Sequence, residues 1–183
     1  MACVGALRTC GAPAPLTLVV RPMRLLQPIE YQPGATSRFF SARTRIKQLL
    51  PNAVVEHIGS SAIPGALSKG DLDICVLVVP PEHEPSVRTL KDWGYIEKTA
   101  TLRTAQLCML EWHTQGEEHA VQLVAHGSPF EMFITFRDAL LSHPSLVAEY
   151  NQVKLAAAHL SEAEYRAAKS TFIESVIRDA KPQ

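Results

Sequence analysis

The sequence predicts an α+β domain, in which a small mixed sheet has one helix before it, one helix within it and a helical layer after it. Short apolar and β-branched segments fill residues 54–125, and helical periodicity dominates on both sides of them. The chain has 183 residues, which is enough for one domain with a substantial core. We therefore expect a two-layer α+β architecture.

Residues 1–25 are expected to form a poorly ordered N-terminal extension, and residues 26–183 the domain. Residues 1–29 include Arg8, Arg21 and Arg24 but no acid, a composition shared by transit peptides. Serine is absent there and no amphipathic pattern is visible. A frayed extension is therefore the favoured interpretation.

The first helix is predicted to begin from a cap at Thr36 or Ser37 and to stop at Pro51, after a turn at 31–34. The apolar side chains of this helix share one stripe: Phe39, Ile46, Leu49 and Leu50.

Four strands are predicted. The segment 54–58 is short and β-branched, and 71–79 is so continuously apolar that a central strand covered on both faces is expected. Residues 59–65 between them are rich in glycine, serine and proline, which is typical of a turn. The segments 106–113 and 119–125 are the third and fourth strands.

Helices are predicted for the remaining segments. Residues 83–93 form a helix that ends near Gly94, and from Pro129 onward apolar stripes recur with helical spacing. The last helix opens with the capping-box pattern 161–164. It is expected to bury one row of side chains: Tyr165, Ala168, Phe172 and Val176.

Composition excludes several classes of function. The 18 basic and 18 acidic residues balance, so no global field favours extended contact with nucleic acid. No apolar run reaches the roughly 18 to 20 residues that cross a bilayer. The cysteines include no Cys-x-x-Cys pair, which leaves zinc ligation without support. Cys75 and Cys108 are expected to be buried thiols, which suits a cytoplasmic protein.

The segment from Gly59 to Asp73 has the features of a phosphate site. Gly59 lets the backbone approach an anion, and the turn that follows offers amides together with the Ser60 hydroxyl. Asp71 and Asp73 are two apart on the predicted strand, so their carboxylates share a face and suit Mg²⁺. Separately, Asp71 could cap the loop and Asp73 could lie at a solvated strand end. Their combination with the Gly-Ser turn favours the functional interpretation.

The segment "VEHIGSSAIPGALSKGDLDI" resembles the GrpB family, whose signature reads His-Ile-Gly-Ser-Thr-Ala-Val-Pro-Gly, followed by a Lys and an Asp. "FRDALLSHPSLVAEYNQVK" and "YRAAKSTFI" are similar to C-terminal elements of that family, and "PIEYQP" is similar to its N-terminal motif. The resemblance covers about residues 26 to 178.

This resemblance implies a nucleotidyltransferase fold of the polymerase-β kind. It places the nucleotide phosphates at the Gly-Ser turn, which includes Gly59, Ser60 and Ser61. It places catalytic metal ions at Asp71 and Asp73. Lys69 and Lys169 match family lysines and either neutralise phosphate or are ordinary surface residues. The implied ligands are Mg²⁺ and a nucleoside triphosphate.

The third carboxylate of the superfamily has no clear counterpart. The predicted strand 119–125 contains no acid, and Gln122 stands where the family usually has His. An amide orients a ligand but is a weak base and a poor Mg²⁺ ligand. Glu111 could substitute, although a solvent-facing role is favoured. His57 is a general base or, as the favoured interpretation, a buried residue bonded to backbone.

Three functions follow from these residues. The first is Mg²⁺-dependent transfer of a nucleotidyl group from a nucleoside triphosphate to a hydroxyl of a small molecule or protein. The second is a catalytically weak nucleotide-binding or regulatory module of the same fold. The third is a structural role, with Asp73 holding the loop. The second carboxylate favours the first function, and Gln122 favours the second. The sequence reveals no aromatic slot for a base.

Overall fold

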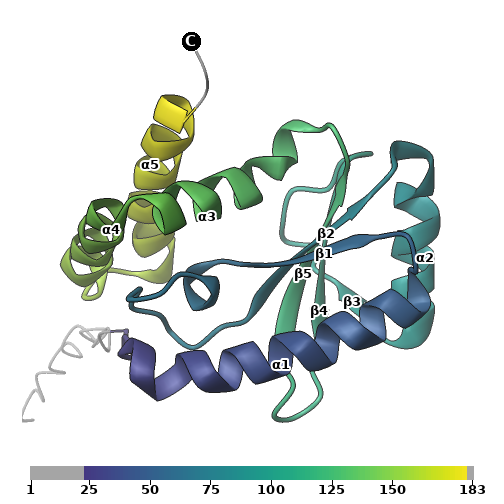
Figure 1. Cartoon of the computed structure of the whole chain (residues 1–183), viewed down its shortest axis with the longest axis horizontal. Helices are drawn as coiled ribbons and strands as arrows, with labels where there is room; N and C mark the ends of the chain where they lie inside the picture. Colours follow the sequence, from purple (N-terminus) through teal and green to yellow (C-terminus); the bar gives the residue numbers. More distant parts are fainter. Residues whose placement is uncertain (1–22, 181–183) are drawn as a thin grey trace, which may run out of the picture.

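The computed structural model describes residues 23–180 (Figure 1), and within that range five strands form one sheet of order β1-β2-β5-β4-β3. Strand β2 is parallel to β5, and the other neighbours are antiparallel. The predicted small mixed sheet is therefore confirmed. The strands are β1 (Val54–Ile58), β2 (Asp73–Val78), β3 (Ile96–Glu97), β4 (Leu107–Trp112) and β5 (His119–Ala125).

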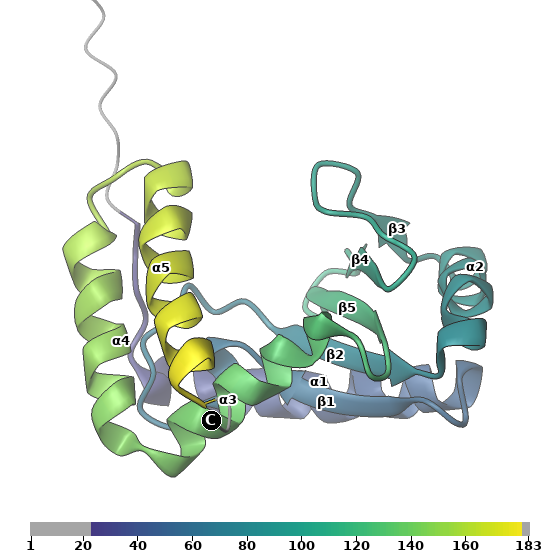
Figure 2. The same cartoon turned by 90° about the horizontal axis from the view of Figure 1, so that it is seen from above.

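The helices surround this sheet as predicted. Helices α1 (Pro28–Leu49) and α2 (His83–Trp93) come before β5 in the chain, and three helices follow it. These are α3 (Met132–Ser142), α4 (Pro144–Ala157) and α5 (Glu162–Ala180). Helices α4 and α5 pack together at one end of the molecule, and α3 connects them to the sheet (Figure 2). Together with α3, this pair is the predicted C-terminal helical layer.

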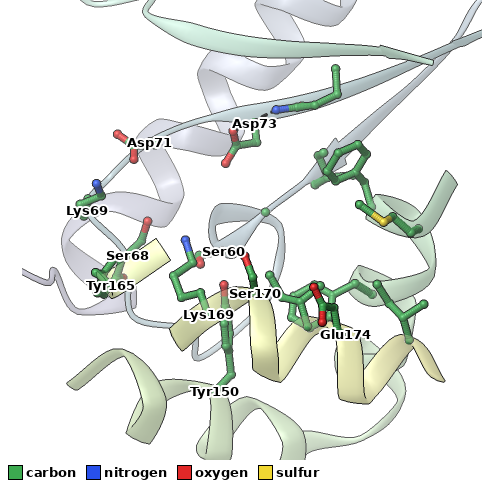
Figure 3. Close-up of a pocket in the computed structure, with 18 residues that line it drawn as sticks. Ser60, Ser68, Lys69, Asp71, Asp73, Tyr150, Tyr165, Lys169, Ser170 and Glu174 are labelled. Atoms are coloured by element: carbon green, nitrogen blue, oxygen red, sulfur yellow. Dashed lines mark hydrogen bonds between the residues drawn. The ribbon is translucent and has the colours of Figure 1, made fainter. Parts of the chain in front are cut away.

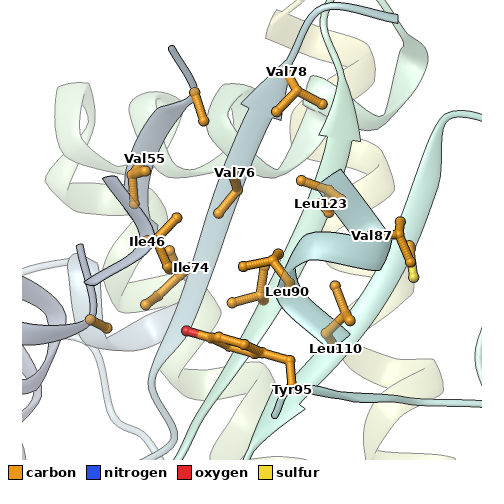
Figure 4. Packing of buried hydrophobic residues seen from close by; sticks show 14 of the residues in the cluster. Ile46, Val55, Ile74, Val76, Val78, Val87, Leu90, Tyr95, Leu110 and Leu123 are labelled. Atoms are coloured by element: carbon orange, nitrogen blue, oxygen red, sulfur yellow. The ribbon is translucent and has the colours of Figure 1, made fainter. Parts of the chain in front are cut away.

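One face of the sheet is closed by an apolar core with helices α1 and α2 (Figure 4). Ile74 and Val76 of β2 point into this core, as does Leu123 of β5, and each is fully buried. Ile46 of α1 and Leu90 of α2 meet them from the helical side. Apolar area removed from water here contributes about 25 cal/mol per Å² to folding, so this face supplies much of the stability.

Helix α1 begins at Pro28 with its cap at Gln27, nine or ten residues before the predicted cap at Thr36 or Ser37, so the predicted turn at 31–34 is wrong. Proline at the first position and the Glu30 carboxylate, which accepts the Gln27 N–H at 2.6 Å, both favour a helix start there. The buried Tyr31 hydroxyl donates to the Ala66 carbonyl at 2.7 Å and anchors the extra turns. Pro33 removes one N–H whose acceptor would be the carbonyl of Ile29, and Ile29 lies in the exposed first turn of the helix.

Two further boundaries differ from the prediction. Strand β2 begins at Asp73, so Asp71 lies just before the strand and not on it. The two-residue strand β3 was missed, because its length gives no visible alternation. Most of the expected N-terminal extension, residues 1–22, lies outside the described range. Within that range, the Met23 N–H donates a hydrogen bond to the Ala158 carbonyl at 2.8 Å.

Among residues 23–180, no helix combines the length and hydropathy that crossing a bilayer requires. Cys75 and Cys108 are buried free thiols, as predicted.

Candidate functional site

Gly59 brings the backbone into contact with the Asp73 carboxylate. It follows β1 with φ of 71°, a conformation that side chains rarely adopt. A Cβ at this position would lie 2.6 Å from Asp73 Oδ2, so only glycine fits. The turn after it, η1 (Ser60–Ala62), makes its first internal bond from the Ala62 N–H to the Gly59 carbonyl. The Ser60 and Ser61 amides precede that bond and find no acceptor within the turn.

The Asp73 carboxylate has few partners that would offset the cost of burying its charge. It is partly buried at the start of β2, opposite Ile58 of β1 and Ala120 of β5. Its one hydrogen bond in the described chain comes from Gln122 Nε2, 3.4 Å from Oδ1. Burial raises the pKa of Asp73, and the negative charge of Asp71 raises it further, against the weaker opposing effect of Lys169. A bound cation would relieve both costs.

Lys69 lies beside Asp71, whereas Lys169 extends from α5 into the recess toward Asp73 (Figure 3). Lys69 Nζ lies 5.7 Å and Lys169 Nζ 5.2 Å from the centroid of the Tyr165 ring. Lys69 also pairs with the exposed Glu162 at 3.7 Å. Burial lowers the pKa of Lys169, and Asp73 partly offsets that shift. Two cations and two carboxylates therefore share one recess.

The recess belongs to a cleft with two adjoining cavities. One, of about 360 Å³, lies between the sheet and helices α3 and α5 and is lined mainly by apolar side chains. The other, of about 650 Å³, extends over β4 and β5 and is lined by charged and polar side chains. The residues that line both cavities are Lys69, Asp71, Asp73, Gln122, Tyr165 and Lys169. The charged residues predicted for the site thus lie where the two cavities meet, which we call the junction.

Ser61 and His57 do not line either cavity, so only the backbone amide of Ser61 is available to a ligand in the recess. Ser61 is buried, and its Oγ lies 2.9 Å from His57 Nε2. The His57 ring stacks on Phe39 at 4.7 Å, on the sheet face opposite Asp73. Burial, aided by Arg137, lowers the pKa of His57 to about 4. His57 is a structural residue, bonded to a side chain where a backbone partner was expected.

Glu111 does not join the aspartates. It is paired with Ala120, which is paired in turn with Asp73, so two strand spacings, roughly 10 Å, separate the two acids. Its carboxylate accepts a hydrogen bond from Lys98 and lies 3.4 Å from His113 Nε2. In the described range no three His, Cys, Asp or Glu side chains come together as a metal site. Glu111 is therefore not the missing third ligand.

Two carboxylates nevertheless fit Mg²⁺. This ion keeps several waters and is commonly held by one or two carboxylates together with substrate phosphates. The raised pKa of Asp73 indicates a site that gains from a cation. Asp71 and Asp73 would hold such an ion when it arrives with a phosphate ligand.

Of the two buried polar groups near the recess, the sequence singled out Gln122 but not Lys154. Gln122 is 7% exposed, and among residues 23–180 its Oε1 finds no hydrogen-bond partner. Lys154 on α4 is 1% exposed, donates to the Leu67 carbonyl and lies 4.1 Å from the Tyr150 ring centroid. Burial and the charge of Lys169 lower the pKa of Lys154 to about 7. The sequence signal that could have revealed Lys154 is its spacing of four residues from Tyr150, because residues with this spacing lie on the same face of a helix.

The sheet order, the Gly-Ser turn and the adjoining aspartates define an α+β protein with one mixed five-stranded sheet and a polar recess at the end of its central strands. The sequence profile described as "GrpB protein" matches residues 27–179. The chain therefore belongs to the GrpB family.

Two relatives and the structure of a GrpB protein agree with this assignment. A UPF0157 protein of Vibrio cholerae is 47% identical over 158 residues, which cover 86% of this chain and 84% of that protein. A UPF0157 protein of Deinococcus radiodurans is 31% identical over 163 residues, with 86% and 82% covered. The crystal structure of GrpB from Enterococcus faecalis aligns with a TM-score of 0.69 at 25% identity, over 86% of this chain and 96% of that one. A structure of the Cid1 poly(U) polymerase with MgATP is more distant, with a TM-score of 0.48 at 19% identity, over 68% and 40%.

Proposed function

We propose that this chain binds a nucleoside triphosphate together with Mg²⁺ and transfers its nucleotidyl group to a hydroxyl acceptor. The observation that carries the proposal is the contact between Gly59 and Asp73, with Lys169 facing them across the cleft. This arrangement brings together three groups in one recess. The backbone at Gly59 can approach a phosphate, the Asp73 carboxylate can bind a cation, and the Lys169 ammonium group can neutralise phosphate charge. The acceptor is a small molecule or a protein side chain.

Each residue has a defined part in this proposal. The Ser60 and Ser61 amides and the Ser60 hydroxyl bind phosphate oxygens, and Lys69 and Lys169 neutralise them. Asp71 and Asp73 would hold Mg²⁺, and the chemistry that the ion would supply there is neutralisation of phosphate charge and activation of the acceptor hydroxyl. The hydroxyl oxygen bonds to the α-phosphorus, the bond to the β-phosphate breaks, pyrophosphate leaves and the hydroxyl proton passes to solvent.

A nucleotide-binding module without efficient catalysis is the second candidate. Gln122 favours it, because an amide stands on β5 beside Asp73 where the superfamily has a third carboxylate. The unpartnered Oε1 of Gln122 suits a ligand that donates a hydrogen bond, such as a bound water or hydroxyl. Such a group orients a ligand whether or not transfer follows.

Thermal unfolding with each nucleoside triphosphate, with and without Mg²⁺, tests the shared part of both candidates. We expect a Mg²⁺-dependent stabilisation of about 2.7 kcal/mol at a ligand concentration 100 times the Kd. Asp73→Asn should abolish it, while the variant alone should unfold at a higher temperature, because a poorly compensated charge is removed. Asp92→Asn on the exposed side of α2 is the matched control and should change neither property.

The rate of pyrophosphate release then separates the two candidates. Sustained, Mg²⁺-dependent release with a hydroxyl acceptor supports the transferase. Stabilisation without release supports the binding module. If no triphosphate stabilises the parent under any condition, both candidates are wrong.

A further inference from the structure

The smaller cavity of the cleft carries an inference about the ligand. It is continuous with the phosphate recess, because Ser60, Asp73 and Lys169 line its inner end. Its volume of about 360 Å³ lies within the range of small-molecule sites, roughly 300 to 1,000 Å³. Its outer walls are the apolar side chains Met132, Phe133 and Phe136 of α3 and Ile173 and Ile177 of α5. We call this cavity the α3–α5 chamber.

We propose that the α3–α5 chamber binds the base of the nucleotide and that Glu174 selects guanine. This inference rests on the proposed function, because the phosphates must occupy the recess at Gly59 for the base to reach the chamber. Flat heteroaromatic rings suit walls of aromatic and branched aliphatic side chains. A chamber of this kind needs few polar groups to fix the orientation of a base.

The periodicity of α5 places Glu174 at the appropriate depth. Ser170, Ile173, Glu174 and Ile177 line the chamber and are spaced i, i+3, i+4 and i+7, as expected for one face of a helix, and Lys169 lines it from the edge of that face. Glu174 follows Lys169 by five residues, a rise of roughly 7.5 Å along the helix. A base lies beyond its own ribose, at a comparable separation from the phosphates. Lys169 and Glu174 can thus contact opposite ends of one nucleotide.

The carboxylate of Glu174 is available to bind a ligand in the chamber. In the described part of the chain it forms neither a hydrogen bond nor an ion pair, although it lines the chamber. Figure 3 shows its carboxylate on the cleft side of α5, turned toward the space between the helix and the sheet. Its neighbours Ile173 and Ile177 are apolar, and in the described residues neither of the two lysines that line the chamber, Lys69 and Lys169, forms an ion pair with it.

The chemistry of a carboxylate selects among the four bases. An ionised carboxylate only accepts hydrogen bonds, and it does so best from two parallel donors. Guanine presents an N–H and an adjacent amino group on one edge. Adenine and cytosine present an amino group beside an acceptor nitrogen, and uracil an N–H between two carbonyl oxygens, so each would place a lone pair against the carboxylate. Guanine is therefore the favoured base.

Titration calorimetry of the full chain with GTP, ATP, CTP and UTP, each with Mg²⁺, tests the inference. We expect GTP to bind at least about tenfold more tightly than the others, since a charge-assisted hydrogen bond contributes that much. Glu174→Gln should reduce this preference about tenfold without abolishing Mg²⁺-dependent binding. Glu149→Gln, an exposed glutamate on α4, is the matched control and should leave the preference unchanged.

The outcomes separate this inference from the proposed function. Equal binding of the four triphosphates, or a GTP preference unaffected by Glu174→Gln, would overturn the selection of guanine and leave nucleotide binding intact. Competition between a triphosphate and an apolar alcohol for the chamber, with no base preference, would assign the chamber to the acceptor. Absence of binding by every triphosphate would overturn both proposals. Because Glu174 is exposed, its substitution leaves the fold intact.

Discussion

The two faces of the sheet differ in how well their buried side chains are matched by suitable neighbours. On one face, Ile74, Val76 and Leu123 are completely buried among apolar partners from α1 and α2. On the other face, the same two strands present Asp73 and Gln122 to a cleft, with one 3.4 Å hydrogen bond between them. Adjacent residues of β2 therefore have opposite energetic roles: Ile74 stabilises the fold and Asp73 costs stability.

This difference indicates where the chain is organised around a ligand. A carboxylate with a raised pKa and an amide oxygen that has no partner among residues 23–180 lie within one recess, beside a glycine whose positive φ lets the backbone approach closely. The first two are local costs that a packed core would avoid. A cation and a phosphate ligand would compensate these costs together, as the proposed function requires.

The largest effect is expected on the closed face. Ile74→Ala should lower the free energy of unfolding by about 2 to 5 kcal/mol, because it leaves a cavity in a fully buried position. Chemical denaturation measures this loss. Asp73→Asn, one residue earlier, should shift stability in the opposite direction. A comparable loss at both positions would contradict the contrast between the faces.

Gly59→Ala is expected to have the next largest effect. The substitution adds backbone strain of about 1 to 3 kcal/mol and pushes against the Asp73 carboxylate. We expect lower stability and the loss of Mg²⁺-dependent stabilisation by a triphosphate, both measured by thermal unfolding. Gly116→Ala is the matched control, since Gly116 also has a positive φ of 82° but open space around it. Equal losses in both variants would show that the contact with Asp73 is unimportant.

The smallest effect concerns Lys154, a buried cation on the cleft side of the molecule. Its pKa is about 7 in the folded protein and near 10.5 when unfolded, so between these values the unfolded chain binds more protons. Stability should therefore rise with pH, by about 1 kcal/mol per unit between pH 7.5 and 8.5. Lys154→Met should remove that slope, as measured by denaturation at each pH. An unchanged slope would mean that Lys154 keeps its charge when buried.

Most of the secondary structure was predictable because its signals are local. Strand β5 matches the predicted segment 119–125, and α2 ends before Gly94 as expected, because Gly94 adopts the left-handed conformation. The start of α1 was not predictable in this way. Pro33 and Gly34 signal a turn locally, whereas the buried Tyr31 hydroxyl holds the helix through Ala66, 35 residues later.

The same division applies to the site. The sequence by itself determined that a Gly-Ser turn precedes two aspartates and that lysines accompany them, since these are facts of residue type and spacing. Only the tertiary structure decided which of these groups meet: it turned the Ser61 hydroxyl toward His57, separated Glu111 from Asp73 by two strands, and brought α5 across the sheet to form the chamber. The physical reason is that backbone preferences act over a few residues. Proximity across a cleft depends on how distant apolar faces pack together.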